Sequence, residues 1–243
     1  MLVEELIRTY APLALFSSLL VFSPLIEGGT VHLSVLIVRL ILLAACTLWL
    51  IFSMRSGWIA IQSSPPFPAS AIFVLWAGFA AIRSPYTAMS LQWLISILSY
   101  AAMLFLVVQF VEATKQVRWL VVVLLGMGCF EAAIGSYQFL WAGDSRAKGT
   151  FVNPNFFASY EVVVFSLAFG LLCFGSCGTA KRWEKLCLWL TAGMTGGAFV
   201  LAQSRGALLG FTVAVGFVGL CRFGKVFLAA LALCLLVGVV VPN

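Results

Sequence analysis

The sequence predicts an all-α, polytopic integral membrane protein with about nine transmembrane helices. Of its 243 residues, 63% are hydrophobic and only 9% are charged, and the mean hydropathy is +1.12. Soluble domains contain about 25% charged residues and about 45 to 50% apolar ones, so a soluble globular fold is excluded. A helical span needs about 20 apolar residues, and open sheet edges cannot be satisfied in lipid. Residues 1–243 are therefore expected to form a single transmembrane domain with short loops.

The apolar runs between charges and Gly or Pro residues give the predicted spans. The first run follows Glu4, Glu5 and Arg8, which sum to minus one. Since this segment has neither a positive n-region nor an A-x-A cleavage site, we expect it to be retained as a span. Two of the runs, 69–82 and 207–220, are short and can be tilted, extended or partly re-entrant. In order, the predicted spans are 10–26, 33–52, 69–82, 91–111, 119–141, 156–176, 186–202, 207–220 and 226–241.

The basic residues predict a cytoplasmic N-terminus. With that orientation, nine of the 14 Lys and Arg residues lie inside, four lie outside and Arg39 lies within a span, as the positive-inside rule favours. No basic run exceeds two residues, so nucleic acid is not expected as a partner. The inner set is Arg8, Arg55, Lys115, Arg118, Lys181, Arg182, Lys185, Arg222 and Lys225, and the outer set is Arg83, Arg146, Lys148 and Arg205.

Neither a disulfide framework nor a metal site is predicted. All seven cysteines fall within spans or on the inner side, where disulfides are rare. Cys173 and Cys177 share a helix face, but they have no His or carboxylate partners that would indicate zinc.

The loop after the fifth predicted span carries Arg146 and Lys148 and ends in Asn153-Pro154-Asn155. Proline excludes its preceding residue from the helical region, and we expect Asn155 to cap the next helix. A helix N-terminus with two nearby cations suits an anion at the membrane surface.

A second outer turn, Gln203-Ser204-Arg205-Gly206, separates two apolar segments. Gly206 permits a close backbone approach, and the planar guanidinium of Arg205 suits phosphate. The alternative interpretation is an interfacial arginine whose side chain extends to the lipid headgroups.

Two motifs in these loops resemble the O-antigen ligase/polymerase family of membrane glycosyltransferases. They are Gly149-Thr-Phe-Val-Asn-Pro-Asn-Phe-Phe-Ala158 and, one span later, Ser204-Arg-Gly-Ala-Leu-Leu-Gly210. The resemblance implies a GT-C-like helix bundle. The family continues into a large outer loop with a catalytic His and then further spans, so we expect this chain to correspond to the N-terminal part of that architecture. His32 is the only histidine, and it does not match the family's His.

The resemblance implies transfer of a glycan from an undecaprenyl-diphosphate carrier to lipid A-core or another glycan. The reaction takes place on the outer face of the bacterial inner membrane, during assembly of O-antigen or another surface polysaccharide. It implies no metal and no cofactor, because arginines hold the diphosphate leaving group. Arg205 and Arg146 are the implied catalytic residues, and Lys148, Asn153, Asn155 and Ser204 are candidate substrate-binding residues.

Polar residues within the spans leave several alternatives open. Arg39 either extends to the outer surface or lines the diphosphate cavity, and Glu161 either orients the acceptor hydroxyl or forms a structural ion pair. Glu131 and Gln138 share a helix face, and interhelical hydrogen bonds are predicted for them. A competing function is a transporter or binding protein for an anionic substrate, without glycosyl transfer.

The predicted orientation can be tested by labelling single cysteines from the two sides of the membrane. Ser145 lies in the outer loop and Thr179 in an inner one, so Ser145→Cys and Thr179→Cys should react from opposite sides. Labelling of both from the same side would contradict the topology and the outer anion site that depends on it.

Overall fold

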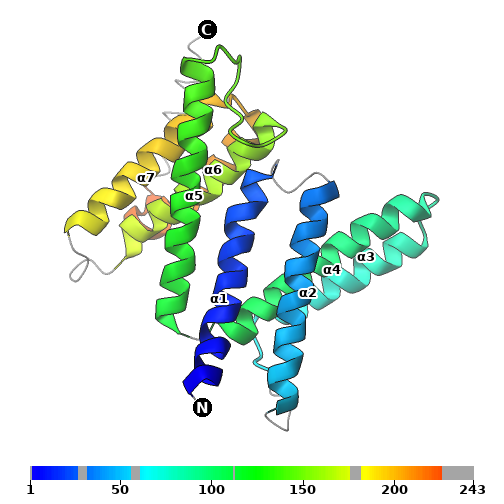
Figure 1. Ribbon diagram of the computed structural model, residues 1–243. Coiled ribbons are helices and arrows are strands. Elements are labelled where there is room, and N and C mark those ends of the chain that lie inside the picture. Colours follow the sequence, from blue (N-terminus) through cyan, green and yellow to red (C-terminus); the bar gives the residue numbers. More distant parts are fainter. Residues whose placement is uncertain (1, 27–31, 56–60, 112, 176–181, 226–243) are drawn as a thin grey trace. The chain divides into compact units, whose positions relative to one another are not determined.

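The computed structural model describes residues 2–26, 32–55, 61–111, 113–175 and 182–225. Within these ranges every regular element is an α-helix (Figure 1), which confirms the all-α part of the predicted fold class. The helices are α1 (Leu2–Leu25), α2 (His32–Arg55), α3 (Pro66–Ile82), α4 (Thr87–Phe110), α5 (Thr114–Leu140), α6 (Pro154–Phe174), α7 (Arg182–Leu201) and α8 (Arg205–Phe223).

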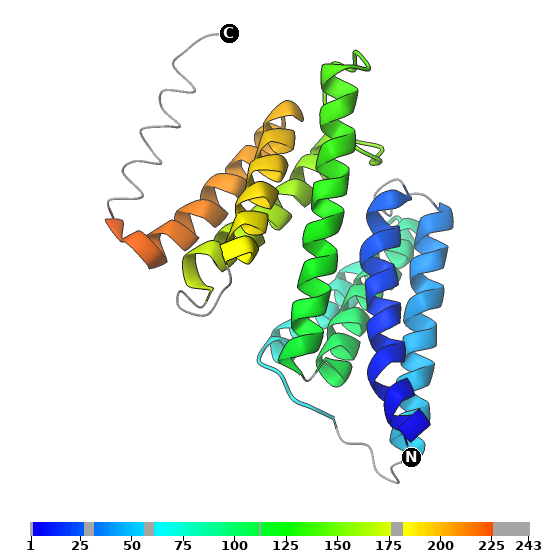
Figure 2. The same ribbon diagram turned by 60° about the vertical axis from the view of Figure 1, so that its left-hand side comes forward.

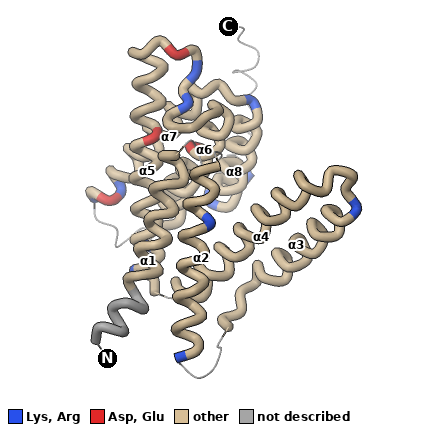
Figure 3. The backbone as a smooth tube through the Cα atoms, turned by 45° about the vertical axis from the view of Figure 1, so that its right-hand side comes forward, with Lys and Arg blue, Asp and Glu red and all other residues tan. Residues whose placement is uncertain are grey.

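The chain is a helical membrane protein. Five helices, α2, α4, α5, α6 and α8, are long and apolar enough to cross a membrane, and α3 and the Tyr10–Leu25 part of α1 are shorter apolar helices. Large apolar side chains such as Leu43, Trp76 and Val213 are exposed, as expected where lipid replaces water. Lys, Arg, Asp and Glu lie mostly at helix ends and in connecting segments (Figure 3). Eight predicted spans coincide with helices, whereas the ninth, 226–241, lies outside the described residues.

The chain divides into two compact units, residues 1–23 with 31–121 and residues 24–30 with 122–243. In the first unit, Phe16, Leu19, Leu42, Ala45 and Leu106 form the buried core. The neighbouring helices α3 and α4 pack against each other, and α2 also contacts α4.

A glutamine fixes the extended segment before α3 in the first unit. The Gln109 side chain accepts a hydrogen bond from the Gln62 backbone N–H at 2.9 Å and donates one to the Gln62 carbonyl at 3.0 Å. Gln109 is itself buried, so this reciprocal pair satisfies polar groups that would otherwise be costly in an apolar environment.

The second unit is built around α6, which packs against both α7 and α8 (Figure 2, yellow and orange helices). Two glycines on one face of α5 leave space for side chains of α6. A Cβ at Gly128 would lie 2.5 Å from Val164, and one at Gly135 would lie 2.6 Å from Phe157. Small residues at such positions are typical of helix interfaces in membranes. This packing places the α5–α6 connection directly before the buried N-terminal part of α6.

Candidate functional site

The start of α6 is set by Asn153 and Pro154. Asn153 is extended (φ −124°, ψ 128°), and its side chain accepts a hydrogen bond from the Asn155 N–H at 2.8 Å. The predicted capping role of Asn155 is therefore wrong, since Asn153 is the N-cap. The fixed φ of proline suits the first helical position, and the residue before it is restricted to the extended region that a cap requires.

Arg146 anchors the α5–α6 connection, residues 141–153, which we term the motif loop. Its Nε donates to the Ala202 carbonyl at 2.9 Å, and its Nη2 donates to the Gln203 carbonyl at 3.3 Å and to Asn155 Oδ1 at 3.0 Å. Carbonyl groups at a helix C-terminus have no intrahelical partner, and they attract cations. The arginine thus joins the motif loop, the end of α7 and the start of α6.

Ala147 adds a backbone contact to this junction. Its N–H donates to the Leu201 carbonyl at 3.2 Å, and the residue is completely buried. The two sequence motifs therefore meet at the same end of the second unit, although one span separates them along the chain.

The α7–α8 turn, residues 202–204, presents Arg205 at the start of α8. Gln203 has a positive φ of 50°, and the buried Ser204 side chain accepts a hydrogen bond from the Ala207 N–H at 3.3 Å. Ser204 is thus a helix cap. Arg205 is exposed. It forms no hydrogen bond or ion pair with any residue that the structure describes, so its guanidinium is available to an anion.

Lys148 is not equivalent to Arg205, because it pairs with a carboxylate. Its Nζ lies 3.7 Å from Asp144 Oδ2, with both side chains partly exposed. Such surface pairs contribute little stability, about 0 to 1 kcal/mol, so an anionic ligand can compete for this lysine.

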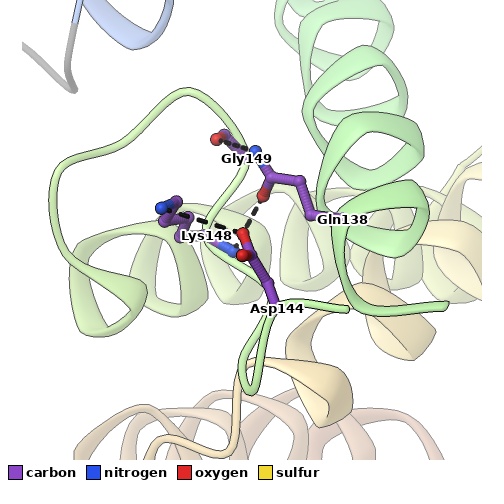
Figure 4. A network of polar contacts seen from close by, with 4 residues as sticks. All are labelled: Gln138, Asp144, Lys148 and Gly149. Carbon is purple, nitrogen blue, oxygen red and sulfur yellow. Dashed lines mark hydrogen bonds and ion pairs between the residues drawn. The ribbon is translucent and has the colours of Figure 1, made fainter. Parts of the chain in front are cut away.

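Gln138 of α5 holds the other side of the motif loop (Figure 4). Its Nε2 donates to the Gly149 carbonyl at 2.8 Å, and its Oε1 accepts from the Lys148 N–H at 3.4 Å. About two turns earlier in α5, the Glu131 carboxyl accepts from the Thr150 N–H at 2.9 Å. The interhelical hydrogen bonds predicted for these two side chains are therefore wrong. Both bond to the loop, because Gly149 and Thr150 fold back onto α5.

Gly149 makes this close approach possible. It has a φ of +58°, and a Cβ there would lie 2.5 Å from Glu131 Oε2 and 2.9 Å from the Phe157 ring. Both the backbone conformation and the lack of space require glycine.

The structural ion pair considered for Glu161 is wrong for the described part of the chain. Glu161 is completely buried, and neither carboxyl oxygen has a hydrogen-bond partner there. Arg39 belongs to the first unit, where its Nη2 donates to Ser96 Oγ of α4 at 3.4 Å. Its role in holding a diphosphate stays a prediction.

Sequence reasoning missed the polar attachment of the motif loop to α5. The available signal was the pair Glu131 and Gln138, seven residues apart in an otherwise apolar span and just before a Gly-Thr motif. Thr150 and the hydroxyl of Tyr160 gave no sequence signal of their own.

Comparisons with protein-family models, with curated proteins and with solved structures found no match to this chain.

Replacing Gly149 tests the attachment of the motif loop to α5. Gly149→Ala should lower the free energy of unfolding by clearly more than the about 1 to 2 kcal/mol of a left-handed non-glycine residue, because the new Cβ also meets Glu131 and Phe157. Gly143→Ala is the matched control, since Gly143 has a φ of +80° but open space around its Cβ position. Equal losses for both variants in a denaturant titration would contradict the close approach.

Proposed function

We propose that the chain binds the diphosphate of a lipid-linked glycan and belongs to a metal-independent membrane glycosyltransferase of the O-antigen ligase/polymerase type. The proposed donor is an undecaprenyl-diphosphate glycan, and the proposed acceptor is lipid A-core or another glycan at the outer face of the inner membrane. The observation that carries the proposal is the meeting of the two motifs, with Arg146 bonded to the turn that ends at Arg205.

The roles of the two arginines differ in this proposal. Arg146 uses its Nε and Nη2 groups on protein acceptors, so it chiefly positions the motif loop and the turn. Arg205 is exposed and free of partners among the described residues, so it is the better diphosphate ligand. Departure of a diphosphate develops negative charge, and a preorganised guanidinium stabilises that charge without reorganisation.

Four further polar residues, in or next to the two motif-bearing segments, support anion binding. Ser204 caps α8, so the N-terminus of that helix directs its remaining N–H groups toward the same region as Arg205. Lys148 adds a cation that is only weakly paired with Asp144. Asn153 and Asn155 fix the start of α6 and the position of Arg146, which makes them positioning residues.

A binding role without transfer is the second candidate, and one observation favours it. Activating an acceptor hydroxyl requires a base within hydrogen-bond reach. Asp144 is the only acid in the two motif loops, and it is paired with Lys148. Glu161 is buried. Neither Asp144 nor Glu161 is therefore both exposed and unpaired, as a base that activates an acceptor hydroxyl would need to be.

Arg205→Lys provides the test. In nanodiscs, the chain should bind undecaprenyl diphosphate, and the lysine variant should bind about tenfold more weakly, which corresponds to about 1.4 kcal/mol, because a compact ammonium cannot form the bidentate fork. Arg83→Lys is the control, since Arg83 is also exposed and its guanidinium lies over the Phe79 ring, 5.6 Å from the ring centroid. Equal affinities for wild type and Arg205→Lys would contradict the proposal.

The same preparations test whether this chain alone carries out the transfer. Incubation with an undecaprenyl-diphosphate glycan and an acceptor should show binding without product for residues 1–243, because neither loop offers an unpaired base. Product formed at the rate of a complete ligase would favour an enzyme whose base lies within this chain.

A further inference from the structure

Two carboxyl groups lie in the interior of the second unit, apart from the proposed anion site. Glu131 of α5 and Glu161 of α6 are both completely buried, and they are close enough to interact electrostatically. No ion pair joins either of them to a Lys or Arg in the part of the chain that the structure describes. Two ionised carboxylates close together in an apolar interior are strongly unfavourable. At least one bound positive charge is therefore required to neutralise one of them.

The hydrogen-bond geometry at Thr150 indicates that this positive charge is a proton. Thr150 Oγ1 lies 2.7 Å from Glu131 Oε1 and also 2.7 Å from the carbonyl oxygen of Pro24. A hydroxyl has one proton, and a carbonyl oxygen only accepts. If Glu131 were ionised, one of these two short contacts would join two oxygens with no proton between them.

A proton on Glu131 Oε1 resolves this conflict. Glu131 then donates to Thr150 Oγ1, and the Thr150 hydroxyl donates onward to Pro24. The other carboxyl oxygen, Oε2, still accepts from the Thr150 N–H. All three contacts are satisfied at their observed lengths by one additional proton.

Glu161 is buried without any hydrogen-bond donor to its carboxyl oxygens among the residues that the structure describes. The hydroxyl of the preceding residue, Tyr160, is likewise buried and has no hydrogen-bond partner among those residues. The titratable groups that interact with this region are Glu131 and Cys129 from α5 and Tyr160 and Glu161 from α6. Thr150 and Pro24 contribute only uncharged groups. Among the described residues, no cluster of three or more His, Cys, Asp or Glu side chains could hold a metal ion.

We propose that Glu131 and Glu161 form a buried proton-binding site, in which the proton on Glu131 lets the Thr150 hydroxyl bond Glu131 and the Pro24 carbonyl at the same time. The site needs neither the diphosphate nor the transfer reaction. Loss of the proton would leave an ionised Glu131 to accept from the Thr150 hydroxyl, and the Pro24 carbonyl would then lose its donor. Proton occupancy therefore links the interior of the unit to the contact between the motif loop and Pro24.

Infrared spectroscopy of the full chain, in a detergent without ester groups, tests the proposal. At pH 7 exposed Asp and Glu side chains are ionised, because their pKa values are about 4. A protonated carboxyl band should nevertheless be present in the wild type. Glu131→Gln should remove a large part of that band while preserving the fold, because the amide donates to Thr150 Oγ1 and its oxygen accepts from the Thr150 N–H.

Two further variants keep the result decisive. Asp144→Asn is the control, since Asp144 is partly exposed and paired with Lys148, and it should leave the band unchanged. Thr150→Val should shift the band, because the acid loses its acceptor. Absence of the band from wild-type protein at pH 7, or a band unaffected by both Glu131→Gln and Thr150→Val, would overturn the proposal.

Discussion

The bond network of Arg146 is the interaction on which the proposed site depends. One guanidinium reaches Ala202 and Gln203 at the end of α7 and Asn155 at the start of α6. These three acceptors come from segments that the chain brings together only through tertiary packing. Hydrogen bonds from a charged group are stronger than neutral ones, and here they satisfy carbonyls that a helix end leaves free. The two sequence motifs form one structural element because of this residue.

The motif loop is held from its other side by α5. Gln138 bonds the backbone at Lys148 and Gly149, and Glu131 bonds Thr150. Gly149 is the residue that permits this contact, since a Cβ there would meet the Glu131 carboxyl and the Phe157 ring. With attachments to both α5 and α7, the loop fixes the turn before Arg205. A binding group on such a supported turn needs little ordering when a ligand arrives, which is the requirement for a preorganised site.

The sequence predicted the helices well, because their signal is local. The predicted spans 33–52 and 156–176 correspond to α2 (His32–Arg55) and α6 (Pro154–Phe174).

The features of the site were harder to predict. The cap of α6 was predicted two residues too late, because asparagines flank Pro154 on both sides and the cap is whichever of them has an extended backbone. Partners of Glu131, Gln138 and Glu161 could not be predicted, since each depends on how the loop folds back onto α5. The proximity of Arg146 to the α7–α8 turn likewise arises from packing across a whole span. In the described part of the chain, five helices have the length and hydropathy expected of a membrane crossing, fewer than the nine spans predicted. The number of spans and the GT-C arrangement therefore stay predictions.

The central claim, that Arg146 fixes the motif loop on the end of α7, is tested most directly at the neighbouring Ala147. That residue is completely buried, and its N–H bonds the Leu201 carbonyl. In a background without the native cysteines, Ala147→Cys should be protected from a thiol reagent, and adding Arg146→Ala should make it reactive. Adding Arg205→Ala instead should leave it protected, because Arg205 has no partner in the described part of the chain. Equal protection with and without Arg146 would contradict the account.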